Sequence, residues 1–126
     1  KIDSGLEIEH TWGSQSDITR ADYEGIIELL YEKGADINLV ESEENGNGWA
    51  PLHHAASLGC LNRVKWLIID RGARIDVGNR QGNTPLMRAC EGGYLEIVLL
   101  FVKFGADLYA SNSSGMTVLH FAAASG

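Results

Sequence analysis

The chain has 126 residues, of which 44% are hydrophobic, and a formal net charge of −7 at pH 7. The apolar fraction is large enough for a folded core, so a disordered chain is excluded. The longest apolar run, residues 97–102, is far shorter than the roughly 20 residues of a membrane-spanning helix, so membrane insertion is not expected.

The negative charge lies near the N-terminus. Residues 1–50 contain 12 acidic and 3 basic side chains, whereas residues 51–126 contain 5 acidic and 7 basic ones. A negative field repels phosphate backbones, so nucleic acid is not an expected partner. The charge favours a protein or peptide with basic residues facing this end, and the alternative is that it only keeps the chain soluble.

The first predicted helix precedes Gly34. Its apolar side chains recur at helical spacing, at Tyr23, Ile26, Ile27, Leu29 and Leu30. An acidic run, Glu-Ser-Glu-Glu, follows at residues 41–44. We expect this run to lengthen an exposed loop, because insertions cost little stability at loop tips.

One phrase then occurs three times. It reads Ala-Pro-Leu-His-His-Ala-Ala at residues 50–56, Thr-Pro-Leu-Met-Arg-Ala-Cys at 84–90 and Thr-Val-Leu-His-Phe-Ala-Ala at 117–123. The leucines of successive phrases are 34 and 33 residues apart. Because Thr caps helices and Pro suits their first turn, each phrase predicts a short helix.

A second helix is predicted after each of the first two phrases. Gly59 and Gly93 end the first helices, and helical apolar patterns follow until Gly72 and Gly105. Seven residues later, the sequences Asn-Arg-Gln-Gly and Asn-Ser-Ser-Gly predict turns. Each unit is therefore a pair of antiparallel helices followed by a turn.

The Thr-Pro-Leu-His-x-Ala phrase at this period resembles the signature of the ankyrin repeat. The resemblance implies an all-α ankyrin-repeat solenoid of stacked antiparallel helix pairs with projecting β-hairpin loops. Within this single domain we assign an N-terminal cap to residues 1–21 and a degenerate first repeat with the acidic insertion to 22–44. Two repeats at 45–78 and 79–111 and a truncated repeat at 112–126 complete the chain.

Departures from the repeat period shape the expected array. Gly34 and Gly72 are 38 residues apart, whereas Gly72 and Gly105 are 33 apart. We assign one extra residue to a wider last turn of the helix ending at residues 68–70, and four to residues 41–44. No Thr-Pro-Leu-His phrase precedes the first helix, so an alternative cap over the end of the array is expected from Leu6, Ile8 and Trp12.

The last unit stops after its first helix, since Gly126 corresponds to Gly93. We therefore expect the chain to be an excerpt of a longer protein or a processed product. An apolar face would then be partly bare and prone to self-association. Its predicted members are Leu100, Phe101, Phe104, Leu119 and Phe121.

The sequence offers no catalytic residues and no metal or cofactor site, so we do not expect an enzyme. Adjacent His53 and His54 diverge by about 100° on a helix and make a poor metal-binding pair. The acids of residues 41–44 lack the spacing of a calcium loop, and no catalytic motif occurs. The resemblance instead implies that His53 and His120 bond to neighbouring loop backbone and to the Thr hydroxyl.

The resemblance also implies a protein-binding surface at the hairpin tips and on the exposed side of the first helices. Matched position by position, it consists of Asn47, Trp49, Ser57, Leu58, Arg80, Gln81, Asn83, Glu91, Ser113, Ser114 and Met116. Trp49 is the main candidate, because aromatic side chains dominate interface energies and its equivalents are Asn83 and Met116. The alternative is that Trp49 packs onto the acidic loop and steadies it, whereas Trp66 is expected in the core.

Two further expectations concern modification and location. Asn38 resembles the loop asparagines that are hydroxylated in ankyrin repeats, and the alternative is an unmodified loop residue. Cys90 takes the place of Ala56 and Ala123, which predicts a small buried residue. Such a cysteine, with Cys60, fits a reducing compartment and hence a cytoplasmic or nuclear, intracellular location.

The function predicted from these features is that of a non-catalytic protein-interaction module and scaffold. One alternative is a targeting or regulatory segment of a larger enzyme or channel. Another is a scaffold that assembles with itself through the C-terminal face.

Overall fold

The computed structural model describes residues 20–42, 44 and 46–126, so the cap predicted from Leu6, Ile8 and Trp12 lies outside the described residues. Every regular element in the described part is helical. The elements are α2 (Arg20–Glu32), α3 (Pro51–Leu58), α4 (Leu61–Lys65), the π-helix η2 (Trp66–Asp70), α5 (Pro85–Gly92), α6 (Leu95–Lys103) and α7 (Val118–Ser125). The all-α prediction is thereby confirmed.

The chain divides after Ala35 into two compact units. The first contains α2, the helix predicted before Gly34. Beyond its last residue, the backbone N–H of Ala35 donates to the carbonyl of Leu30 at 3.1 Å. Gly34 there has a φ of 109°, a conformation that glycine adopts without steric cost.

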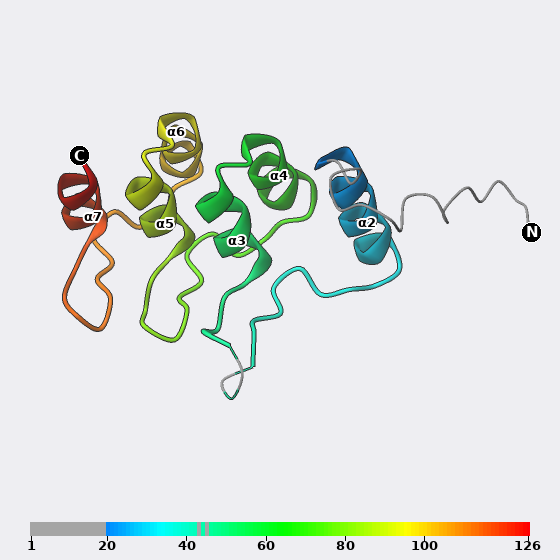
Figure 1. The fold of residues 1–126 in the computed structure, drawn as a ribbon, viewed down its shortest axis with the longest axis horizontal. Helices are drawn as coiled ribbons and strands as arrows, with labels where there is room; N and C mark the ends of the chain where they lie inside the picture. The colour runs from blue at the N-terminus through cyan, green and yellow to red at the C-terminus, as the bar shows by residue number, and fades with distance from the viewer. Residues whose placement is uncertain (1–19, 43, 45) are drawn as a thin grey trace, which may run out of the picture. The chain divides into compact units, whose positions relative to one another are not determined.

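The second unit begins at Asp36 and consists of helix pairs (Figure 1). Pro51 and Pro85 occupy the first positions of α3 and α5, where a missing N–H breaks no helical hydrogen bond. Gly59 and Gly93 end these helices with left-handed φ angles of 75°. The predicted helix starts and stops are confirmed.

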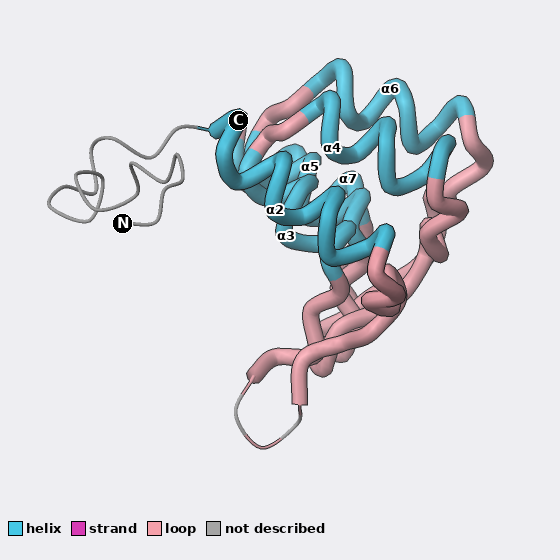
Figure 2. The backbone as a smooth tube through the Cα atoms, turned by 90° about the vertical axis from the view of Figure 1, so that its right-hand side faces the viewer, coloured by secondary structure: helices cyan, strands magenta, loops and turns pink. Residues whose placement is uncertain are grey.

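The first helices of the repeats form one layer, in which α3 packs against α5 and α5 against α7. Leu52 and Leu86 are fully buried, and the small Ala55, Ala56 and Ala89 allow the helices to approach closely. Figure 2 shows α4 and α6 in a second layer, with the loops extending to one side. The core between the layers includes Val64, Leu67, Ile97 and Phe101.

The helix that ends at Asp70 contains the extra residue that its length predicts. The N–H of Ala73 donates to the carbonyl of Leu67 six residues earlier, whereas the equivalent bond from Ala106 to Phe101 spans five residues. The π-helix Trp66–Asp70 accommodates the difference. Trp66 itself is half-buried and not a core residue, and the Arg71 guanidinium carbon lies 5.2 Å from its ring centroid.

Two burial predictions need correction. Phe101 does not belong to a bare C-terminal face: it is fully buried, because it occupies the core position of the equivalent Leu67. Leu119 and Phe104 are exposed on that side, at 75% and 42%. Cys90 is only half-buried, unlike the buried Cys60, and burial raises the pKa of its thiol.

Candidate functional site

Three loop tips project from the same side of the first helices (Figure 1). We call residues 41–42, 44 and 46–49 the first tip, 79–83 the second and 112–116 the third. In the second tip, the N–H of Asn79 donates to the carbonyl of Asn83 at 2.9 Å. In the third, the equivalent bond from Asn112 to Met116 is also 2.9 Å long.

Each of the two later tips is braced by the side chain of its leading asparagine. Asn79 Oδ1 accepts from the N–H groups of Gln81 and Asn83 at 2.9 and 2.8 Å. Asn112 Oδ1 accepts from the N–H groups two and four residues later, both at 2.9 Å. One amide oxygen thus satisfies two backbone donors and holds the turn in one shape.

In the first tip, the carboxylate of Glu41 replaces the asparagine amide. The N–H of Glu41 donates to the carbonyl of Trp49, and Glu41 Oε1 accepts from Asn47 and Trp49 at 3.1 and 3.4 Å. Glu41 is therefore in register with Asn79, and the four extra residues lie between Glu41 and Trp49. The assignment of Glu41 itself to the insertion was wrong.

Neighbouring tips are joined through their backbones. The N–H of Arg80 donates to the carbonyl of Asn47, and the N–H of Ser113 donates to the carbonyl of Gln81, both at 2.8 Å. Gly48 has a φ of 75°, and a Cβ there would lie 3.1 Å from the nitrogen of Arg80. The tips therefore form a row connected by backbone bonds.

The implied histidine roles are confirmed in part, since His53 bonds to the neighbouring loop and His120 to the Thr hydroxyl. His53 Nδ1 accepts from the N–H of Ala50 at 2.9 Å, so its Nε2 carries the proton and donates to the carbonyl of Asn83 at 2.8 Å. Burial of this neutral ring lowers the pKa of His53. His120 Nδ1 lies 2.9 Å from the Thr117 hydroxyl oxygen.

Trp49 lies against side chains of the first helices α3 and α5. Its ring centroid is 4.7 Å from that of His54, and the Arg88 guanidinium carbon lies 4.9 Å from the Trp49 centroid. His54 Nε2 is 2.8 Å from Glu41 Oε2, and Arg88 Nη1 is 2.6 Å from Glu91 Oε1. These five residues, Glu41, His54, Trp49, Arg88 and Glu91, form what we call the inner-face cluster.

The inner-face cluster connects the first tip to α3 and α5. The hydrogen bond with His54, followed by the backbone bond from Asn47, lowers the pKa of Glu41. Trp49 is half-buried here, so it neither projects freely nor packs only on the acidic loop. Its packing against His54 and Arg88 was not anticipated from the sequence, although both residues occupy variable positions of the repeated phrase.

The structure separates the predicted surface residues into two groups. Seven are exposed: Asn47, Leu58, Arg80, Gln81, Glu91, Ser113 and Ser114. Four are half-buried: Trp49, Ser57, Asn83 and Met116. Asn83 has a clear structural role, because it accepts hydrogen bonds from His53 and from the side-chain amide of Asn112.

Asn38 links two successive repeats. Its Oδ1 accepts from the N–H of Arg74 at 2.9 Å, and its own N–H donates to Asp36 Oδ1 at 2.9 Å. In the next repeat, Asp76 Oδ1 accepts from the N–H of Asp107 at 3.0 Å in the same way. Hydroxylation of Asn38 stays a prediction.

Nowhere in the described part do three or more His, Cys, Asp or Glu side chains gather as metal ligands would. The helices of residues 20–42, 44 and 46–126 are too short or too polar to cross a bilayer.

A family model described as ankyrin repeats (3 copies) matches residues 18–112 and, in a second register, residues 62–126. The chain belongs to the ankyrin repeat family. Ankyrin repeats generally mediate protein–protein interaction, and the ankyrin domain itself is non-catalytic. The solenoid expected from the repeated phrase is confirmed.

Curated relatives carry a similar ankyrin segment. The chain is 42% identical over 78 residues to probable E3 ubiquitin-protein ligase XBOS33 of Oryza sativa subsp. japonica, which covers 61% of the chain and 15% of that protein. It is 39% identical over 101 residues to the B-cell lymphoma 3 protein homolog of Mus musculus, covering 79% and 22%.

A third relative is the transient receptor potential cation channel subfamily A member 1 of Homo sapiens. The two are 38% identical over 79 residues, which cover 61% of the chain and 7% of the channel. The chain thus spans less than a quarter of the length of each of these three relatives.

Proposed function

We propose that this ankyrin array binds a protein or peptide partner through its three tips and through the exposed side chains of α3 and α5 on the side of the inner-face cluster. The observation that carries the proposal is the row of tips, joined by the bonds from Arg80 to Asn47 and from Ser113 to Gln81. Backbone atoms and the side chains of Glu41, Asn79 and Asn112 maintain this row. A preformed row loses little conformational entropy when a partner binds.

The exposed side chains support the same surface. Arg80, Gln81 and Ser113 project from the tips, and Leu58 is 64% exposed at the end of α3. Donors, acceptors and an apolar side chain therefore lie along one side of the array. A partner could use them without disturbing the bonds that build the turns.

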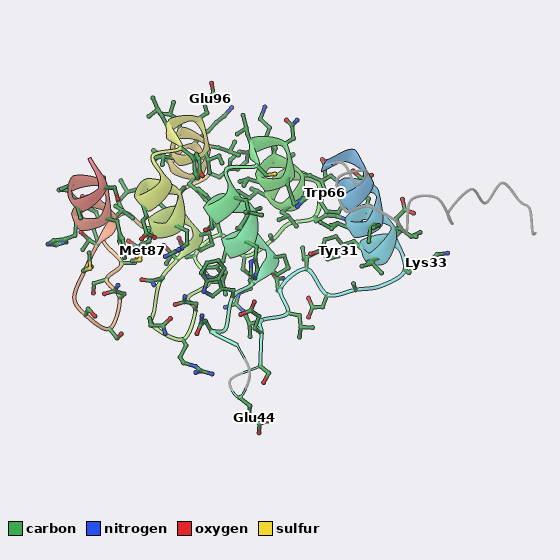
Figure 3. The ribbon with its side chains drawn as sticks, in the orientation of Figure 1. Tyr31, Lys33, Glu44, Trp66, Met87 and Glu96 are labelled. Carbon is green, nitrogen blue, oxygen red and sulfur yellow. The ribbon has the colours of Figure 1, made fainter. Side chains whose placement is uncertain are left out.

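The charge of the chain supports a partner with basic residues. Glu44 lies exposed at the end of the first loop (Figure 3). Residues 1–50 hold most of the excess negative charge. Opposite charges would speed the encounter with a basic partner, and this effect weakens as salt is added.

The experiment compares capture by the wild-type chain with capture by Arg80→Ala/Gln81→Ala. Both side chains are exposed, and the tip bonds of Arg80 and Gln81 use their backbone atoms, so the fold is expected to survive. Arg74→Ala is the matched control, because Arg74 is also exposed and lies outside the tips. Captured proteins are then produced recombinantly and their affinities measured directly.

We expect the double variant to bind at least one captured protein tenfold or more weakly, while Arg74→Ala binds it like wild type. Equal affinities for all three chains would refute the proposed surface. Circular dichroism melting confirms that each variant is folded.

A second candidate is a targeting or regulatory segment of a larger enzyme or channel. It is supported by the relatives, a probable ubiquitin ligase and a cation channel, in which the matching segment is 15% and 7% of the length. Sequencing the full transcript tests this candidate. An open reading frame confined to these residues would contradict it.

Self-assembly through the C-terminal face is a third candidate, supported by the exposure of Leu119 and Phe104. Light scattering would show a concentration-dependent oligomer that Leu119→Glu dissolves, and a monomer at all concentrations would reject this candidate.

We also propose an intracellular location, cytoplasmic or nuclear, supported by the free thiols of Cys60 and Cys90. Cell fractionation tests the location.

A further inference from the structure

A groove of about 320 Å³ lies between α4 and α6. Figure 2 shows these two helices in the second layer, which we also call the outer layer. Leucines form its apolar part, and charged side chains form its remaining walls. The lining consists of Leu61, Lys65, Glu96, Leu99, Leu100 and Lys103. The tips and the inner-face cluster contribute no residue to this lining.

Helical spacing explains why these side chains converge. Glu96, Leu99 and Lys103 are three and four residues apart, so they share one face of α6, and Leu61 and Lys65 are four apart on α4. Leu99 remains 57% exposed at this face. Leu61 of α4 and Leu99 and Leu100 of α6 together give the groove its apolar part.

The acidic and basic residues of α6 lie at opposite ends of the groove. Glu96 lies in the first turn of α6 and Lys103 in its last turn. Figure 3 shows Glu96 on the outer side of α6. Among residues 20–42, 44 and 46–126, ion pairs join Glu41 with His54 and Arg88 with Glu91, and neither pair includes the exposed Lys65 or Lys103. Both ammonium groups are therefore open to carboxylates from outside.

We propose that the groove between α4 and α6 binds an acidic amphipathic helix of a protein partner. Its apolar side chains contact Leu61, Leu99 and Leu100, and its carboxylates pair with Lys65 and Lys103. Helix-in-groove recognition of this kind uses apolar residues three or four positions apart. Because the groove is separate from the tips, this proposal stands or falls independently of the proposed function.

The test uses the whole 126-residue chain and a fluorescein-labelled synthetic peptide. The peptide is helical, with leucines at positions i, i+3, i+4 and i+7 flanked by glutamates. Fluorescence anisotropy should show saturable binding, weakened at least tenfold by Lys65→Glu/Lys103→Glu and also by Leu99→Glu. A peptide with lysines in place of the glutamates should bind at least tenfold more weakly.

The matched control is Leu95→Glu. Leu95 is 67% exposed on α6 but does not line the groove, so this variant should bind within twofold of wild type. Circular dichroism melting checks each fold, and the lysine double variant decides the test if Leu99→Glu unfolds, because both lysines are exposed. The proposal would be overturned by no saturable binding, by equal binding of the basic peptide, or by an unaffected lysine double variant.

Discussion

The first and second tips solve the same problem with different side chains. In the second tip, the amide oxygen of Asn79 accepts two backbone N–H groups two and four residues ahead. In the first tip, four extra residues separate those donors from the start of the turn, and the longer, charged Glu41 reaches them. Both tips therefore keep an oxygen acceptor at the start of the turn, whereas the length of the loop and the type of the accepting residue differ between them.

The difference has electrostatic consequences. A carboxylate also pairs with His54 and thereby joins the first tip to the inner-face cluster, which the neutral Asn79 does not do. The second tip instead depends on the buried, neutral His53 beneath Asn83. The two tips therefore differ in their sensitivity to mutation and to acid.

The largest effect is expected at the second tip. Asn79→Ala removes the acceptor of two N–H groups around a buried position, and leaving such donors unsatisfied costs about 1–3 kcal/mol. Urea unfolding measures the loss. Asn79→Asp keeps the acceptor and is the control, and a wild-type midpoint for Asn79→Ala would show that the brace is dispensable.

Trp49→Ala tests the packing that is particular to the first tip. The ring contacts His54 and the Arg88 guanidinium, and loss of the cation–π contact alone is worth about 0.5–2 kcal/mol. A lower thermal midpoint is therefore expected. If the midpoint is unchanged and partner binding is lost, Trp49 is a recognition residue with no structural contribution.

Acid is expected to weaken the tips in two separate pH ranges. His53 has a native pKa below its ordinary 6.5, so the unfolded chain takes up this proton first and stability falls as the pH drops below 6.5. Glu41 has a pKa below its ordinary 4.5, so its contribution is present above 4.5 and is lost as the pH falls further.

Nuclear magnetic resonance titration of the His53 ring checks the upper range, and urea unfolding at several pH values checks both. A His53 midpoint at or above 6.5 would contradict the buried neutral ring. A Glu41→Gln variant with the same stability profile below pH 4.5 as wild type would contradict the assignment of the lower range.

The smallest expected effect is local. In Glu41→Ala, the amides of Asn47 and Trp49 lose the carboxylate oxygen that accepts from both, so they should exchange hydrogen faster. The amides of Gln81 and Asn83 serve as internal controls and should keep their rates. Unchanged exchange at Asn47 would mean that Glu41 does not hold the first tip.

Repeated local signals made most of the fold predictable. The leucine period, the prolines at helix starts and the glycines at helix ends act within a few residues, so the sequence shows them directly. The extra residue before Gly72 could likewise be assigned to a helical turn, where the π-helix lies. That inference needed only the number of residues between successive glycines and the helical pattern of the residues before Gly72.

The contacts between repeats were harder to predict. Glu41 was assigned to the insertion because its side chain is a carboxylate, whereas the equivalent residues of the later tips carry an amide. Both groups nevertheless supply an oxygen acceptor. The packing of Trp49 depends on side chains 5 and 39 residues away, His54 and Arg88. The outer groove arises from two helices in different repeats, and no single repeat contains its pattern.

Hydrogen exchange of the chain, alone and with a partner captured by the wild type, tests the binding surface most directly. Slower exchange is expected in the second and third tips, at Arg80, Gln81 and Ser113, and along the exposed end of α3. Slower exchange confined to α4 and α6, with the tips unchanged, would contradict that expectation.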